Sequence, residues 1–228
     1  MTVKRRRKID TVLAQRQPDL TVLAECLHKP RNFSAIVRTC DAVGVNEVHA
    51  VPGEKGVAVH WKTSQGAEKW VRVRPHDSMA DACSYLRARG FQLVAAHLAE
   101  DAVDYREVDY TVPTALLMGT ELFGVSPAGL AQSDVQVTIP MKGMTQSLNV
   151  SVACAIVLYE AMRQRDAAGL YGRRQLDRGL REAQRFEWLH PTLTRYCVER
   201  GLAYPDLDEE GNVVGVVPRG RLRDAGPG

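Results

Sequence analysis

Small, flexible and polar residues interrupt an otherwise apolar stretch in the second half of the chain, where residues 137–160 read VTIPMKGMTQSLNVSVACAIVLYE. The pattern predicts an apolar strand at 137–140 and a long apolar helix from about Asn149. Asn149 or Ser151 can cap the first free backbone amides of that helix. A strand, a tight turn and a helix amino terminus together form a cradle for an anion or another ligand. A plain strand-to-helix connection of an α/β domain would have the same pattern.

Two earlier segments place charged or amide side chains among apolar residues. NFSAIVRT contains Asn32 and Arg38, and LLMGTELFGVS contains Glu121. Because a guanidinium keeps its proton at neutral pH, Arg38 is suited to hold a phosphate or stabilise developing negative charge rather than to act as a base. Simpler roles stay open: an ion pair of Arg38 with Asp41 or Glu121, a helix cap for Asn32, and a solvent-facing loop charge for Glu121.

Several common kinds of site lack their sequence signature. The five cysteines are scattered and never form a CxxC pair, and the six histidines show no HExxH spacing, so we expect neither a disulfide framework nor a metal site. No GxGxxG follows a predicted strand, and GxxxxGK[ST] is absent. A Rossmann dinucleotide site or a P-loop is therefore not indicated.

Positive charge is concentrated in two flanks of the chain. Residues 1–20 carry six Lys or Arg against two acidic residues, and residues 161–200 carry nine against five, whereas residues 21–160 carry twelve against fifteen. This pattern suits a catalytic core with extensions that bind nucleic acid, although solvated helix faces would give a similar count. No apolar run reaches the ~20 residues of a membrane span, and the basic start lacks the apolar stretch of a secretory signal. We expect a soluble cytoplasmic protein.

Strands and helices are predicted to alternate through the middle of the chain. The predicted strands are 21–26, 45–51, 91–98, 115–119 and 135–140, and the predicted helices are 3–18, 32–43, 77–90 and the one from Asn149. Residues 55–70 fit neither pattern. Five strands alternating with helices imply a mainly parallel α/β sheet with helices on both faces.

The two ends of the chain read as helical extensions of that sheet. We predict a basic helical arm at 1–19, a sheet domain at 20–165, and a basic helical extension with a polar, loosely ordered tail at 166–228. Within residues 171–190, arginines alternate with Tyr171, Phe186 and Trp188, which suits RNA backbone contact and base stacking. The apolar residues of the same stretch are equally suited to dock a helix.

Taken in order, the segments NFSAIVRT (32–39), LLMGTELFGVS (116–126) and IPMKGMTQSLNVSVACAI (139–156) resemble the three signature motifs of the SpoU class of SPOUT RNA 2′-O-methyltransferases. The resemblance covers roughly residues 10–170. It implies a sheet whose carboxyl end is tied into a deep trefoil knot, which the strand pattern alone would not suggest. It also implies a homodimer and the cofactor S-adenosylmethionine.

The resemblance also implies which residues form the site. S-adenosylmethionine is expected to contact mainly backbone groups of Ala96, Met118, Gly119, Ile139, Met144 and Leu148. The catalytic residues are expected to be Asn32, Arg38, Glu121, Ser147 and Asn149. The chain departs from the motif at Ala96, where the family has a threonine before the histidine. A backbone contact would survive this change, but a hydroxyl contact would not.

The expected reaction is methyl transfer to the ribose 2′-hydroxyl of guanosine 18 in the D-loop of tRNA. Basic residues of both extensions are expected to contact the RNA: Lys4, Arg5, Arg6, Arg7, Lys8, Arg163, Arg165, Arg173 and Arg174. Two alternatives remain at this point. The same chemistry would serve on ribosomal RNA or another tRNA position, and a protein that has lost catalysis would keep only RNA binding.

Overall fold

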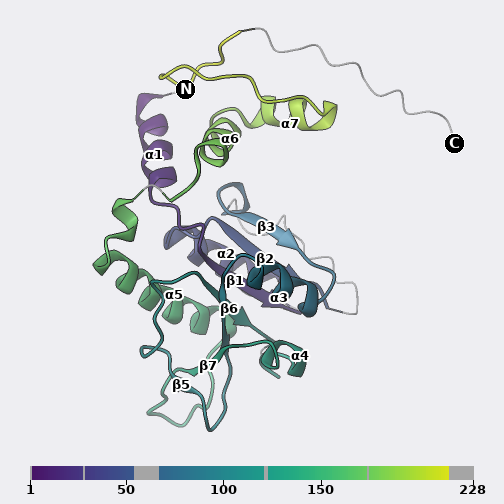
Figure 1. Ribbon diagram of the computed structural model, residues 1–228, viewed down its shortest axis with the longest axis vertical. Coiled ribbons are helices and arrows are strands. Elements are labelled where there is room, and N and C mark those ends of the chain that lie inside the picture. The colour runs from purple at the N-terminus through teal and green to yellow at the C-terminus, as the bar shows by residue number, and fades with distance from the viewer. Residues whose placement is uncertain (1, 28, 54–66, 121–122, 174, 216–228) are drawn as a thin grey trace, which may run out of the picture. The chain divides into compact units, whose positions relative to one another are not determined.

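The computed structural model describes residues 2–27, 29–53, 67–120, 123–173 and 175–215 (Figure 1). The chain forms two compact units. Residues 16–173 make up one, and the two ends of the chain, up to residue 15 and from residue 174, make up the other. The two ends of the chain, which contain the predicted arm and extension, thus pack into a single unit.

A seven-stranded sheet forms the centre of the larger unit. Its strands are β1 (Leu20–Glu25), β2 (Glu47–Val51), β3 (Arg72–Pro75), β4 (Gln92–Ala96), β5 (Val103–Asp104), β6 (Thr114–Met118) and β7 (Val135–Thr138). The strand order is β3-β2-β1-β6-β4-β7-β5, and every pairing is parallel. All residues of the neighbouring strands β1 and β6 are buried. Their continuous apolar runs follow from that position, because both faces of a parallel sheet are covered.

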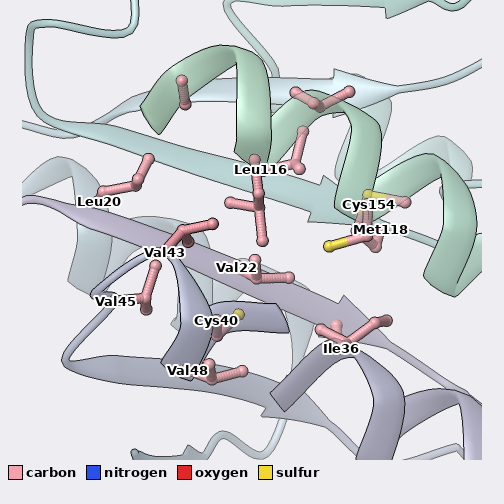
Figure 2. Close-up of a cluster of buried hydrophobic side chains, with 14 of the residues drawn as sticks. Leu20, Val22, Ile36, Cys40, Val43, Val45, Val48, Leu116, Met118 and Cys154 are labelled. Carbon is pink, nitrogen blue, oxygen red and sulfur yellow. The ribbon is translucent and has the colours of Figure 1, made fainter. Parts of the chain in front are cut away.

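Helices cover both faces of the sheet. The sheet lies between two clusters of buried apolar residues, one on each face. The first core contains Val22 of β1 and Leu116 of β6, together with residues of α2 (Pro30–Ala42) and α5 (Val150–Ala167), and Figure 2 shows part of this core. The second contains Leu23 and Leu117 with residues of α3 (Met79–Arg87), near the short α4 (Pro127–Leu130). Successive residues of one strand thus point to opposite faces.

Two strands are absent from the prediction. β3 reads RVRP and forms one edge of the sheet, where its two arginines are partly exposed, so it lacks the apolar run of an inner strand. β5 has two residues and forms the opposite edge. Edge strands bury little surface, and a hydrophobic pattern therefore does not reveal them.

Arg165, predicted to contact RNA, lies in the interior and has no exposed side-chain surface. Its Nη1 donates to a carboxylate oxygen of Asp19 at 2.6 Å and to Oε1 of Gln17 at 2.9 Å. Its Nε donates to the carbonyl of Tyr110 at 2.9 Å. The prediction for Arg165 is therefore wrong: this arginine of α5 joins the segments that enter β1 and β6.

The unit formed by the chain ends is helical. It contains α1 (Val3–Ala14), α6 (Arg178–Leu189) and α7 (Pro191–Arg200), and α1 packs against α6. Leu176, Phe186, Trp188 and Leu189 are buried, as expected of residues that dock a helix. In residues 207–215, the part of the tail that the structure describes, Leu207 and Val213 form an antiparallel bridge, so this part is more ordered than predicted. Across the described ranges, no helix combines the length and hydropathy needed to cross a membrane.

Candidate active site

A cavity of about 410 Å³ lies at the carboxyl ends of β4, β6 and β7, beside the start of α5. Its walls include Ala96, Met118, Gly119, Ile139 and Leu148. These three strands are neighbours in the sheet, in the order β6-β4-β7. Ligands of open parallel sheets bind at this edge, where the loops that leave the strands meet. The cavity is therefore the candidate active site of the larger unit.

After β6, the backbone of Gly119 and Thr120 lies close to the backbone of Gly124. The backbone amide of Thr120 donates to the carbonyl of Gly124 at 2.8 Å, and the amide of Gly124 donates to the carbonyl of Thr120 at 2.9 Å. A Cβ atom on Gly119 would lie 1.8 Å from the Gly124 oxygen, so any larger residue would displace the loop. Gly124 has φ +66°, which favours glycine. Glu121 lies between these glycines, outside the described residues.

His97 is a wall residue that the sequence did not single out. It follows β4 directly, and its backbone amide donates to the carbonyl of Val137 at 3.1 Å. Its ring faces Gly124, where an added Cβ would lie 2.8 Å from Nδ1. Within the described ranges Nδ1 is buried and has no hydrogen-bond partner. A polar residue directly after a buried strand was the signal available in the sequence, because such positions border the carboxyl edge of a parallel sheet.

Five of the six residues predicted to bind the cofactor line this cavity: Ala96, Met118, Gly119, Ile139 and Leu148. Met144 does not, and its side chain is 99% exposed. The side chains that face the cavity are mainly apolar, and the remainder of its surface consists of loop backbone and a few polar groups such as those of Gln146 and Ser147.

Asn32 and Asn149 bring the first and third sequence motifs together. Asn149 caps α5, and its Oδ1 accepts from the backbone amide of Ser151 at 3.0 Å and from the Ser151 hydroxyl at 2.6 Å. Its Nδ2 then donates to Oδ1 of Asn32, in the first turn of α2, at 3.4 Å. The side chain of Asn149 thus caps α5 and also connects the start of α5 to the start of α2. The predicted cap at Asn149 is confirmed.

The remaining catalytic candidates lie at different distances from the cavity. Ser147 is exposed and lines it. Arg38 is exposed on α2, six residues after Asn32, and is not among the lining residues. Six residues along an α-helix correspond to a rise of about 9 Å. The structure therefore unites Ser147, Asn149 and Asn32 at one edge, with Arg38 further along α2.

The predicted RNA-binding residues mostly lie on the surface. In α1, Lys4, Arg5, Arg7 and Lys8 are exposed and Arg6 is half-buried. Arg163 is exposed and its Nη2 forms an ion pair with Glu160 at 2.7 Å. Arg173 is exposed, and Arg174 lies outside the described residues.

Buried thiols provide no nucleophile for this site. Burial raises the pKa of Cys154 in α5 far above its ordinary value, and burial is also the main cause that raises the pKa of Cys40 in α2. Both therefore stay protonated, and a thiol without its negative charge is a weak nucleophile and metal ligand. Among the residues that the structure describes, no cluster of His, Cys, Asp or Glu is suited to hold a metal ion.

An all-parallel sheet with a largely apolar cavity at its carboxyl edge defines an α/β protein with a candidate small-ligand site there. A family model described as the SpoU rRNA Methylase family matches residues 19–159, and a second, described as SpoU, rRNA methylase, C-terminal, matches residues 163–215. The chain belongs to the SpoU rRNA methylase family. The resemblance read from the three motifs is thereby confirmed.

Curated relatives resemble nearly the whole chain. A tRNA (guanosine(18)-2′-O)-methyltransferase of Thermus thermophilus is 55% identical over 188 residues, which are 82% of this chain and 97% of the relative. An enzyme of the same name from Escherichia coli is 47% identical over 216 residues, or 93% of this chain and 94% of the relative. Both names describe the reaction that the motifs implied.

Solved structures support the fold class. The A. aeolicus TrmH/SpoU tRNA modifying enzyme has a TM-score of 0.75 and 45% identity, covering 81% of this chain and 94% of that one. The SpoU methyltransferase AviRb from Streptomyces viridochromogenes, in complex with the cofactor AdoMet, has a TM-score of 0.59 and 29% identity, covering 66% and 62%. The predicted mainly parallel α/β sheet of a SPOUT methyltransferase is confirmed.

Proposed function

We propose that this protein transfers a methyl group from S-adenosylmethionine to the ribose 2′-hydroxyl of guanosine 18 in tRNA. Two curated relatives at 55% and 47% identity carry this activity in their names. The observation that carries the proposal is the cavity at the carboxyl edge, together with the Asn32–Asn149 contact that joins the first and third motifs beside it.

The cavity suits S-adenosylmethionine in size and chemistry. Its volume of about 410 Å³ falls in the range of small-ligand sites. Apolar side chains such as Ile139 and Leu148 would flank the ligand, and the tight loop from Gly119 to Gly124 lets backbone groups approach it closely. The Nδ1 of His97, which has no hydrogen-bond partner among the described residues, is a buried polar atom in the same wall. When bound, the cofactor supplies an electrophilic sulfonium methyl group.

The chain's own residues would orient the ribose and control its proton. A ribose hydroxyl is a poor nucleophile, so it must be held in line with the methyl group and lose its proton. We assign Arg38 to the adjacent phosphate and to the negative charge that develops on the 2′-oxygen. The phosphate or Glu121 would accept the proton. The side chains of Asn32, Ser147 and Asn149 would lie between the cofactor and the ribose.

We also propose a homodimer, as the family resemblance implies. The support is α5, whose buried side contains Cys154, Val157 and Leu158, while its other side exposes Val152 by 46% and Tyr159 by 49%. A helix that is apolar on all sides is normally covered on all sides. Phe123 and Met144 near the same edge are 81% and 99% exposed, and large exposed apolar groups mark contact surfaces.

The remaining proposals concern topology and substrate capture. We infer that the chain is knotted where the segment after β7 passes the loop after β6. We assign the basic arms at 1–18 and 161–190 to gripping tRNA, with the exposed residues of α1 making phosphate contacts that raise affinity without choosing sequence. Its tRNA substrate places the enzyme in the cytoplasm.

Incubation of unmodified tRNA with labelled S-adenosylmethionine, followed by mapping of ribose methylation, tests the function. We expect one methyl group on guanosine 18 with the wild type and at least a hundredfold slower transfer with Arg38→Ala, because transition-state charge is then uncompensated. A tRNA carrying adenosine at that position is the substrate control. Methylation only of ribosomal RNA would contradict the proposed tRNA substrate. Full activity of Arg38→Ala would contradict the role assigned to Arg38.

A further inference from the structure

The unit formed by the chain ends contains a cavity of its own, with a volume of about 710 Å³. α1 contributes Asp10 and Leu13, α6 contributes a row of arginines, and the segment after α7 contributes Tyr204 and Asp206. The volume lies within the ~300–1,000 Å³ of small-ligand sites. The cavity lies largely in the segments proposed above to grip tRNA, but none of the residues named individually above as a cofactor, catalytic or RNA contact lines it.

Two of the three arginines that line the cavity are neutralised within the protein. Arg185 donates through Nε to Asp10 at 2.7 Å, and Arg178 donates through Nε to Glu182 at 2.7 Å. Arg185 also reaches the carbonyls of Asp208 and Glu209, so it fixes the tail against α6. Arg185 thus links α6 to α1 and to the tail, whereas the Arg178 pair lies on the surface of α6.

Arg181 is the third arginine, and its charge is not neutralised in this way. It is half-buried on α6, one turn from Arg178 and from Arg185, and it lines the cavity. In the described part of the chain, no carboxylate forms an ion pair with Arg181. A guanidinium held by its helix beside a cavity and lacking an anionic partner is suited to bind a phosphate group from outside.

An aromatic pair forms another part of the wall. The rings of Phe186 and Tyr204 are stacked, with centroids 4.7 Å apart and an interplanar angle of 16°. Phe186 is buried, whereas Tyr204 is half-buried and its hydroxyl donates to Glu187 at 3.2 Å. The ring of Tyr204 is thus fixed from one side by Phe186 and at its tip by Glu187. A fixed aromatic ring at a cavity is a stacking surface for a nucleobase.

We propose that this cavity binds one unpaired nucleotide of the substrate RNA, with the phosphate on Arg181 and the base against Tyr204. The inference rests on the proposed function for the identity of the RNA. Asp206 at the same cavity would accept a hydrogen bond from an amino group of the base. The site explains why the two ends of the chain form one unit, because Asp10 of α1 positions Arg185 across from the tail.

Equilibrium binding of unmodified tRNA to the full-length protein, measured over a range of salt concentrations, tests the proposal. Arg181→Ala should weaken binding about tenfold and reduce the slope of log K against log salt by about one phosphate contact. Arg195→Ala is the matched control, since Arg195 is exposed on α7 and does not line the cavity. It removes the same charge and should weaken binding by less than about twofold.

The aromatic contact is tested separately with Tyr204→Leu and Tyr204→Phe. Loss of the ring should weaken tRNA binding about tenfold, whereas Tyr204→Phe keeps the ring and should bind like the wild type. Equal binding by Arg181→Ala and Arg195→Ala, or by Tyr204→Leu and Tyr204→Phe, overturns the site. Cofactor binding by each variant shows whether the sheet domain is intact. Failure of the wild type to methylate any tRNA would instead overturn the proposed function, because binding and methyl transfer are measured independently.

Discussion

The two ends of the sheet differ in what their polar groups contact. At the amino ends of the strands, Arg16 and Arg165 are fully buried and bond to carbonyl groups of the segments that enter β1, β2, β3 and β6. Each also forms an ion pair, Arg16 with Asp41 at 2.5 Å and Arg165 with Asp19 at 2.6 Å. At the carboxyl ends, the loops enclose a cavity and the Nδ1 of His97 is unpartnered among the described residues.

This difference separates stability from function within one sheet. A buried arginine that saturates strand-entry carbonyls fixes the positions of several segments at once, but it offers nothing to a ligand. At the opposite edge, loop backbone groups and His97 border the cavity instead. Substitutions at the amino edge should therefore change folding most, and substitutions at the carboxyl edge should change ligand binding and catalysis most.

The largest effect is expected for Arg165→Ala. This change leaves Asp19 and several carbonyls without their donor, and we expect a loss of about 3–5 kcal/mol in the free energy of unfolding. Arg163→Ala is the control on the same helix. Its ion pair with Glu160 is at the surface, and its loss should cost less than about 1 kcal/mol. Urea unfolding, monitored by circular dichroism, measures the free energy of unfolding of both variants. Equal losses would contradict the stabilising role assigned to the buried arginines at the amino ends of the strands.

At the carboxyl edge, Asn149→Ala should slow catalysis. The variant loses the α5 cap, worth about 1 kcal/mol of stability, and the contact to Asn32, so we expect kcat to fall about 100-fold through misplacement of the reacting groups. Asn149→Asp keeps an oxygen to cap Ser151 but has no amide to donate to Asn32. Asn149→Asp should therefore be as stable as the wild type, but its kcat should be as low as that of Asn149→Ala. Recovery of both would show that Asn149 serves only as a cap.

Acid should destabilise the protein through a histidine pair on the carboxyl side of the sheet. Nδ1 of His49 in β2 lies 2.8 Å from Nε2 of His76, which follows β3. Burial, helped by the nearby His76 and Arg74, lowers the pKa of His49 to about 3, and burial also lowers the pKa of His76. The unfolded chain thus takes up the His49 proton near pH 6.5, but the folded protein does not. Stability is present above that pH and is lost as the pH falls towards 3.

Unfolding experiments at pH 7 and pH 5 measure this effect. For His49 alone we expect a loss of about 2 kcal/mol at pH 5 relative to pH 7. His49→Gln removes the titrating group and leaves all carboxylates in place, so it should show a correspondingly smaller decrease. An identical decrease in the variant and the wild type would assign the acid sensitivity to other groups.

The sequence was most informative where one local pattern determines the structure. Apolar runs predict β1 and β6, and Asn149 before an apolar run predicts the start of α5. Arg165 was misassigned because a basic helix end looks the same whether its cation faces solvent or turns inward to Asp19. Only the three-dimensional arrangement brings residues 146 positions apart into contact.

The site was predicted only in part for the same reason. Motif resemblance identified five residues that line the cavity, because they belong to contiguous segments of the chain. It did not identify His97, whose distinguishing feature is a buried ring nitrogen that has no hydrogen-bond partner within the described ranges. Nor did the apolar face of α1, with Ile9 and Leu13, reveal that its partner is α6, more than 160 residues later. Such pairings depend on contacts between distant segments.

The smallest expected effect is that of Gly124→Ala, and it tests how tightly the carboxyl edge is packed. An alanine at φ +66° is strained, and its Cβ would lie 2.8 Å from Nδ1 of His97. We expect a loss of about 1–2 kcal/mol in stability and weaker binding of S-adenosylmethionine, because the His97 ring must move within the cavity wall. Isothermal titration calorimetry and thermal unfolding measure the two effects.

Gly90→Ala isolates the contribution of the contact with His97. Gly90 has φ +79°, and a Cβ added there would meet no atom within 4 Å, so this variant carries backbone strain without a clash and should leave cofactor binding unchanged. In a His97→Ala background, Gly124→Ala should cost no more than Gly90→Ala, since the ring that it displaces is gone. If Gly124→Ala keeps its full effect on cofactor binding without His97, the loop itself and not the histidine determines the shape of this wall. The unpartnered nitrogen would then have no part in the difference between the two ends of the sheet.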